Sequence, residues 1–157
     1  MRSAREVSSS VTRILLLDSG VLGMVSHPRR NPDPKAWLVD RIDAGDVALI
    51  PDVADYEVRR ELLRAGKTTG INRLDALCLS LGVVATTPAI LREAASMWAI
   101  ARQEGRPTAV DAALDFDVII AAQARGIGRD GHEVVVATTN VAHLDRFVDA
   151  RRWDVIT

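Results

Sequence analysis

The sequence predicts an α/β fold in which a central, mostly parallel sheet of about five strands lies between two layers of helices. Short runs of large apolar residues, too short for helices, are typical of strands buried on both faces. Stretches with helical spacing separate these runs, and this alternation favours a parallel sheet. A length of 157 residues with 48% hydrophobic content is enough for one domain with a substantial core.

The first strand is expected at residues 13–17, where four consecutive large apolar residues are followed by Asp18, Ser19 and Gly20. Other short apolar runs bounded by turn residues have the same character. They predict four further strands, at residues 47–50, 83–86, 133–138 and 153–156.

Helices are expected between these strands, because prolines and glycines mark their ends and apolar residues follow a helical period. The second of them would begin at Pro34 and bury Trp37, Leu38 and Ile42. Residues 105–107 and the Gly126-Ile127-Gly128 segment are expected to be loops. The predicted helices cover residues 21–26, 34–44, 51–65, 68–81, 87–104, 115–124 and 143–148.

Residues 1–12 are polar, rich in Ser and Arg and without the apolar segment of a signal peptide, so we expect a flexible leader before a single domain at 13–157. No apolar run reaches the length of a membrane span, and Cys78 has no cysteine partner. A cytoplasmic protein that does not enter membranes is therefore expected. The net charge of −1 gives no overall basic field, so nucleic-acid binding would need a local patch.

Two acidic residues are expected near the carboxyl ends of the first two strands, where open parallel sheets bind ligands. Asp18 directly follows the first strand, although Asp and Ser at such a place often cap the next helix. Glu57 lies in the second turn of the helix after the second strand. Its alternative role is a surface ion pair with Arg60 or Arg64.

Asp117 stands near the start of the most apolar helix, with Ile120, Ala121 and Ala124 on its own face. A carboxylate in that position either caps the helix or lies near groups that compensate its charge. Asp115 is the expected cap, which leaves Asp117 available.

A fourth expected element ends in polar groups, because Thr138, Thr139 and Asn140 follow an apolar strand. These groups ordinarily cap the next helix, and they can also hold a water or a phosphate oxygen beside a metal. Three carboxylates delivered to the same edge of the sheet need a compensating cation. Oxygen ligands alone favour Mg²⁺ or Mn²⁺ over zinc.

The order of these motifs resembles that of a PIN domain, most closely the VapC type found as toxins in bacterial toxin-antitoxin pairs. It extends over nearly the whole chain from Arg13 onward. The resemblance implies a PIN-like three-layer α/β/α sandwich and a magnesium-dependent endoribonuclease. The motifs are Leu-Leu-Leu-Asp18, Pro51 with Tyr56-Glu57-Val58-Arg59-Arg60-Glu61-Leu62, Asp117-x-x-Ile-Ala-Ala-x-Ala and Ala-Thr-Thr-Asn140-x-x-His-Leu.

The resemblance carries specific roles onto this sequence. It implies Asp18, Glu57 and Asp117 as the ligands of Mg²⁺ or Mn²⁺, and Asn140 as a fourth catalytic residue. The products would carry a 5′-phosphate and a 3′-hydroxyl. The expected substrate contacts are Ser19, Arg59, Arg60 and Thr139.

The sequence departs from the family after the fourth strand, where members often carry a further acidic residue. Here that region offers Asn140 and His143, with Asp145 later. The number of metal ions therefore stays open, as does a contribution from Asp115 or Asp145.

The resemblance also implies partners: an RNA substrate, a cognate antitoxin over the acidic edge and a second copy in a homodimer. The alternative is a non-catalytic PIN-like module that binds RNA or protein. A response-regulator-type domain also places an aspartate at a strand end, but it needs a lysine after its last strands. Neither Lys35 nor Lys67 lies there.

Overall fold

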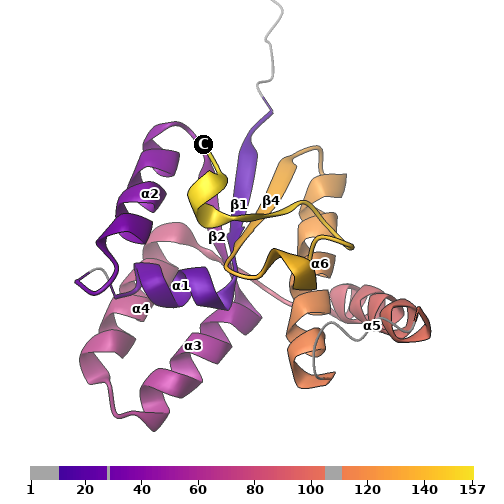
Figure 1. Cartoon of the computed structure of the whole chain (residues 1–157), viewed down its shortest axis with the longest axis horizontal. Helices are drawn as coiled ribbons and strands as arrows, with labels where there is room; N and C mark the ends of the chain where they lie inside the picture. The colour runs from indigo at the N-terminus through magenta and orange to yellow at the C-terminus, as the bar shows by residue number, and fades with distance from the viewer. Residues whose placement is uncertain (1–10, 28, 105–110) are drawn as a thin grey trace, which may run out of the picture.

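The computed structural model of the chain describes residues 11–27, 29–104 and 111–157, with the side chains of 111–113 excepted. Most of the predicted leader and the predicted loop at 105–107 lie outside the described residues. Within the described part, five parallel strands form one sheet in the order β3-β2-β1-β4-β5 (Figure 1). The strands are β1 (Arg13–Leu17), β2 (Val47–Pro51), β3 (Val83–Val84), β4 (Glu133–Thr138) and β5 (Ala150–Arg152).

Helices cover both faces of the sheet, with α1 to α4 on one side and α5 and α6 on the other in Figure 1. This arrangement confirms the predicted three-layer α/β/α architecture. None of the described helices combines the length and apolar character needed to cross a bilayer. The helices are α1 (Ser19–Val25), α2 (Pro32–Asp43), α3 (Asp52–Arg64), α4 (Thr68–Leu81), α5 (Pro88–Gln103) and α6 (Asp111–Arg129), with 3-10 turns η1 (Val141–His143) and η2 (Trp153–Val155).

The apolar run of β1 is buried because alternate side chains enter different layers. Leu15 and Leu17 belong to the cluster that includes Trp37 of α2. Leu16 packs on the opposite face, in the cluster that includes Ile120 of α6. A central strand covered on both sides needs apolar residues at every position, which explains why β1, β2 and β4 were predictable.

Three details of the predicted helices are wrong. Helix α6 begins at Asp111, so Asp115 lies in its second turn and does not cap it. The helix also continues through the predicted Gly126–Gly128 loop, because Ile127 packs against the core and holds that turn to the sheet. Ile42 is 41% exposed rather than buried, although Trp37 and Leu38 of the same helix are buried as predicted.

The predicted last strand at 153–156 is wrong, because the strand is Ala150–Arg152 and the 3-10 turn η2 follows it. Trp153 leaves the sheet to pack edge-on against Trp37, with 5.8 Å between ring centroids. The indole N–H of Trp37 donates to the carbonyl of Ile156 at 3.0 Å. These contacts turn the chain end across α2.

The predicted third strand and the predicted last helix are both shorter than expected. Strand β3 ends at Val84, because the N–H and hydroxyl of Thr86 donate to Asp52 instead of continuing the sheet. In place of a helix at 143–148, the structure has the single 3-10 turn η1 followed by irregular turns.

Candidate functional site

Asp18 lies at the junction of β1 and α1 with both carboxylate oxygens engaged. Oδ1 accepts from the backbone N–H of Ser19 at 2.7 Å. Oδ2 accepts from the hydroxyl of Thr138 at 2.7 Å. Because β1 and β4 are neighbouring parallel strands, the residues that follow them meet although 120 positions separate them. The two hydrogen bonds fix the direction in which the Asp18 carboxylate points.

Glu57 lies in α3, the helix that follows β2, and its carboxylate comes close to Asp18. The Ser19 hydroxyl donates to its Oε2 at 3.3 Å. Burial raises the pKa of Glu57, and repulsion from Asp18 raises it further, while the Ser19 hydrogen bond and Arg60 act in the opposite direction. The shift shows that Glu57 and Asp18 are close enough to repel each other.

Asp117 of α6 completes the group and is the least compensated of its members. The residue is 9% exposed, and its Oδ2 is buried without a hydrogen-bond partner in the described residues. His143 Nδ1 lies 3.5 Å from this oxygen, too far for a good hydrogen bond. Burial, with repulsion from Asp18 and Glu57, raises the pKa of Asp117 to about 7. We call Asp18, Glu57 and Asp117 the acidic cluster.

The acidic cluster fits a hard divalent cation by its chemistry. Its donors are all carboxylate oxygens, the type that Mg²⁺ and Mn²⁺ prefer, and the buried Oδ2 of Asp117 accepts no hydrogen bond from the described residues, with His143 3.5 Å away. Among the described residues, no group of three or more His, Cys, Asp or Glu side chains already stands in an arrangement that could hold a metal ion. The three carboxylates are thus close enough to affect one another's pKa values, but they are not arranged as the ligands of a bound metal ion.

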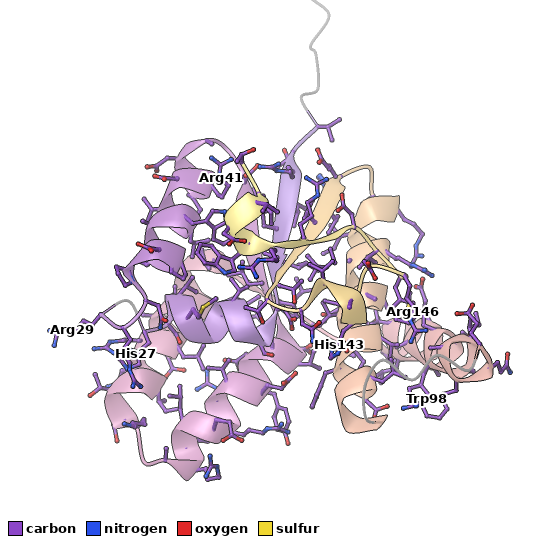
Figure 2. All side chains as sticks on the ribbon, in the orientation of Figure 1. His27, Arg29, Arg41, Trp98, His143 and Arg146 are labelled. Carbon is purple, nitrogen blue, oxygen red and sulfur yellow. The ribbon has the colours of Figure 1, made fainter. Side chains whose placement is uncertain are left out.

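The turn after β4 approaches the acidic cluster through a histidine. The Asn140 backbone N–H donates to the Thr138 hydroxyl at 3.0 Å, and the Asn140 amide lies 3.0 Å from His143 Nε2. His143, which lies beside α6 in Figure 2, is 3.5 Å from Asp117 of that helix. The sequence predicted a surface or capping role for His143, although its position in the segment that departs from the family was a signal.

Thr139, Asp115 and Asp145 occupy different surroundings. The side chain of Thr139 packs against the start of α1, where a Cβ on Gly20 would come within 2.7 Å of its Oγ1. Asp115 is exposed and lines a groove between α5 and α6 with Leu91 and Trp98. Asp145 is exposed in the turn after η1.

The two arginines expected to contact substrate differ. Arg59 forms ion pairs with Asp55 at 2.9 Å and Asp75 at 2.8 Å, which commits it to the contact between α3 and α4. The Arg60 guanidinium lies 5.4 Å from the ring centroid of Tyr56 and 5.6 Å from that of Phe116. Since Arg60 also lowers the pKa of Glu57, it is the arginine that faces the acidic cluster.

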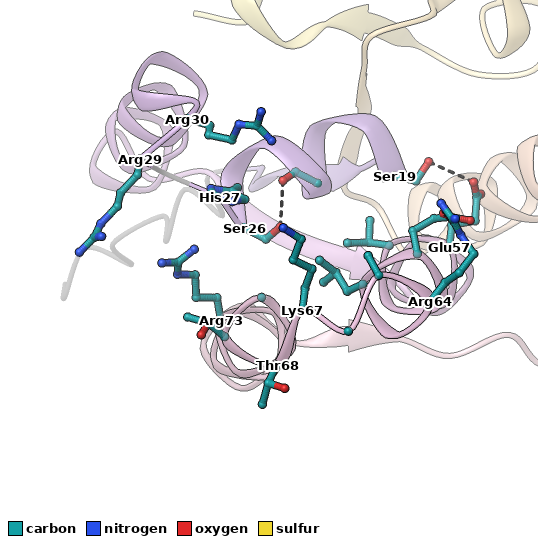
Figure 3. A pocket seen from close by; sticks show the side chains of 18 of the residues that line it. Ser19, Ser26, His27, Arg29, Arg30, Glu57, Arg64, Lys67, Thr68 and Arg73 are labelled. Carbon is teal, nitrogen blue, oxygen red and sulfur yellow. Dashed lines mark hydrogen bonds and ion pairs between the residues drawn. The ribbon is translucent and has the colours of Figure 1, made fainter.

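A groove of about 960 Å³ runs between α1 and the α3–α4 hairpin (Figure 3). Ser19 and Glu57 form one end, so the groove opens directly beside the acidic cluster. We call it the cationic groove after five of its lining residues. The sequence did not reveal it, because its charges come from two segments about 40 residues apart: Arg29, Arg30, Arg64, Lys67 and Arg73.

Known structures share this fold. The VapBC2 structure from Rickettsia felis, bound to a DNA fragment from their promoter, contains a chain that matches with a TM-score of 0.71 and 14% identity. The match covers 90% of this chain and 99% of that chain. This chain has the fold of a VapC-type PIN domain. The resemblance inferred from the motif order is thereby confirmed at the level of fold.

Two further PIN-fold matches cover 90% of the chain. VapBC-1 from nontypeable Haemophilus influenzae matches with a TM-score of 0.66 and 17% identity over 98% of that chain. FitAcB from Neisseria gonorrhoeae matches with a TM-score of 0.67 and 20% identity over 99% of that chain. No protein-family model matches the sequence, and no curated protein does.

Proposed function

We propose that this PIN-fold chain is a magnesium-dependent endoribonuclease that hydrolyses RNA phosphodiester bonds. The observation that supports it most is the buried Oδ2 of Asp117, which accepts no hydrogen bond from the described residues and lies beside Asp18 and Glu57. A protein gains nothing in stability by burying a carboxylate among like charges, so such an arrangement favours a functional role.

In this proposal Asp18, Glu57 and Asp117 hold the cation, Mg²⁺ or Mn²⁺. When bound, the cation supplies an activated water near neutral pH and offsets negative charge on the phosphate. Ser19 and Thr138 hold the Asp18 carboxylate in place through their hydrogen bonds. Glu57, oriented by the Ser19 hydroxyl, completes the ligand set or orients the nucleophile through a water.

The substrate phosphate would be placed by groups around the acidic cluster. Thr139 and Arg60 would supply donors to the phosphate, while Ser19 orients Glu57. Asn140 positions His143 beside Asp117, and Arg59 holds α3 against α4 through Asp75. The attacking water loses a proton to solvent and its oxygen forms a new bond to phosphorus, while the bond between phosphorus and the 3′-oxygen breaks. The 3′-oxygen takes a proton from solvent, which leaves a 3′-hydroxyl and a 5′-phosphate.

We also propose that the chain is the toxin of a toxin-antitoxin pair, with a cognate antitoxin and a homodimeric state. The support is that the matching chains come from VapBC and FitAcB structures. The alternative is a non-catalytic PIN-fold module that binds RNA or protein, which Asn140 favours because family members often carry an acid in that region. Cleavage assays separate the two.

The test is cleavage of a labelled single-stranded RNA by the wild type, Asp18→Asn and a matched control, Asp52→Asn. Asp52 also follows a strand of the sheet, but its carboxylate is satisfied by Thr86 and Gln123. We expect magnesium-dependent cleavage by the wild type and Asp52→Asn, and none by Asp18→Asn with an unchanged circular dichroism spectrum. Equal cleavage by Asp18→Asn would refute the proposal and indicate a contaminating nuclease.

A further inference from the structure

The cationic groove gathers positively charged side chains, most of which have no acidic partner among the described residues. Many arginines of the described surface pair with acids, as Arg13 does with Asp46 and Arg129 with Glu93. Within the cationic groove Arg64 also has an acidic neighbour, Glu61, at 2.7 Å. The other four cations form no side-chain hydrogen bond or ion pair with any described residue. They are Arg29, Arg30, Lys67 and Arg73.

Four unpaired cations around one cavity repel each other, which costs stability in a chain whose net charge is only −1. The cost is understandable if an anion binds between them. Figure 3 shows Arg30 and Arg29 on the α2 side of the cationic groove, with Lys67 and Arg73 facing them from the α3–α4 hairpin. The opposing cations can therefore contact one elongated anion from both sides.

The groove is continuous with the acidic cluster, and this continuity favours a polymer over a small anion. Ser19 and Glu57 form the end of the groove nearest the cluster, while Arg29 lies far out beyond α1 (Figure 2). A phosphate chain that enters a site of three carboxylates meets repulsion there. Cations along the adjoining groove offset that repulsion, and arginine forks match phosphate oxygens.

We propose that the cationic groove binds the phosphate backbone of a single-stranded RNA on one side of the bond to be cleaved. This inference rests on the proposed ribonuclease function and extends it, because it assigns the path of the strand to Arg29, Arg30, Lys67 and Arg73. Val58 and Leu62 also line the cationic groove and give the bases an apolar surface to contact. An acidic peptide is the competing occupant.

Binding of a fluorescein-labelled single-stranded RNA, measured by anisotropy from 50 to 300 mM salt, tests the proposal in the Asp18→Asn background. The groove variant is Lys67→Gln with Arg73→Gln. The matched control is Lys35→Gln with Arg92→Gln, which removes the same charge outside the groove from side chains that are likewise unpaired among the described residues. Each lost phosphate contact on a single strand reduces the steepness of the plot of log affinity against log salt by about 0.7.

We expect the groove variant to make the salt dependence less steep by about 1.4 and to weaken the affinity about 25-fold at 0.1 M salt. The control should change little. Arg29→Gln with Arg30→Gln should repeat the result from the opposite wall and guards against a folding defect in either pair. The difference in affinity between groove variant and parent should disappear when the RNA is shortened from one end, and should persist when it is shortened from the other. The reason is that the groove binds the strand on one side of the cleaved bond.

An equal slope in groove variant and control, with firm RNA binding by the parent, overturns the inference and leaves the proposed function intact. Binding of poly-glutamate that the groove variant loses, with RNA binding unaffected, overturns it in favour of an acidic peptide. No binding or cleavage of RNA by the wild type overturns this inference together with the proposed function.

Discussion

Two aspartates follow adjacent strands of the sheet, yet their surroundings differ sharply. Asp52, after β2, accepts from the Thr86 N–H at 2.7 Å, the Thr86 hydroxyl at 2.6 Å and the Gln123 amide at 3.1 Å. Asp18, after β1, accepts two hydrogen bonds but faces Glu57 and Asp117, whose pKa values it raises. Both aspartates follow a strand, so the side chains around each carboxylate decide its role. A carboxylate surrounded by donors ties elements together, whereas carboxylates gathered against each other need a cation.

The largest contrast is expected in activity. Asp117→Asn should abolish magnesium-dependent RNA cleavage, because it removes the least compensated charge of the acidic cluster. The same substitution should raise the midpoint of thermal unfolding at pH 8, because it relieves repulsion. Parallel cleavage assays and melts check both effects, and a variant that loses stability along with activity would contradict the account.

The pH dependence of stability should follow the raised pKa of Asp117. In the unfolded chain this carboxylate ionises near pH 4, and in the folded protein near pH 7. Folding therefore becomes less favourable as pH rises through this window, by at most about 4 kcal/mol, and is unaffected by this group below it. Denaturant unfolding of the wild type and Asp117→Asn between pH 4 and 8 measures the difference. Parallel curves would refute the assigned cause.

Asp52→Ala should lower stability rather than alter chemistry. It leaves the N–H and hydroxyl of Thr86 without their acceptor and removes one of the acceptors of the buried Gln123 amide, which costs about 1–3 kcal/mol. Denaturant unfolding checks the loss, and the magnesium concentration for half-maximal cleavage should not change. A shift in that concentration would place Asp52 within the metal site.

The smallest effect is expected at Arg60, which is partly exposed beside Tyr56 and Phe116. Arg60→Leu should raise the KM for RNA by about fivefold or less without lowering kcat, since exposed ion pairs contribute little. Steady-state kinetics of Arg60→Leu and of the control Arg92→Leu measure the effect. Arg92 is an exposed arginine of α5. An equal effect in both variants would remove Arg60 from the substrate path.

The strands and the order of elements could be predicted because they depend on local patterns. Strands β1, β2 and β4 are continuous apolar runs, and a parallel sheet places the residues after them at one edge. The ends of α6 and the last strand could not be predicted, because distant contacts decide them. Ile127 holds the last turn of α6 to the core, and Trp153 leaves the sheet for Trp37.

The gathering of the three carboxylates was predictable, but the contacts around them were not. The motif order named Asp18, Glu57 and Asp117, and the structure brings their charges within mutual influence. Three contacts around the site join residues that lie 16 to 71 positions apart. They are the ion pair of Arg59 with Asp75, the hydrogen bond from Gln123 to Asp52, and the contact of His143 with Asp117. No sequence window contains such information.

Calorimetric titration of Mn²⁺ into the wild type, Asp117→Asn and Asp52→Asn at pH 8 tests most directly whether the acidic cluster is a metal site. Binding is expected for the wild type and Asp52→Asn, and loss of binding for Asp117→Asn. Absence of binding in the wild type, or equal binding in all three proteins, would contradict it.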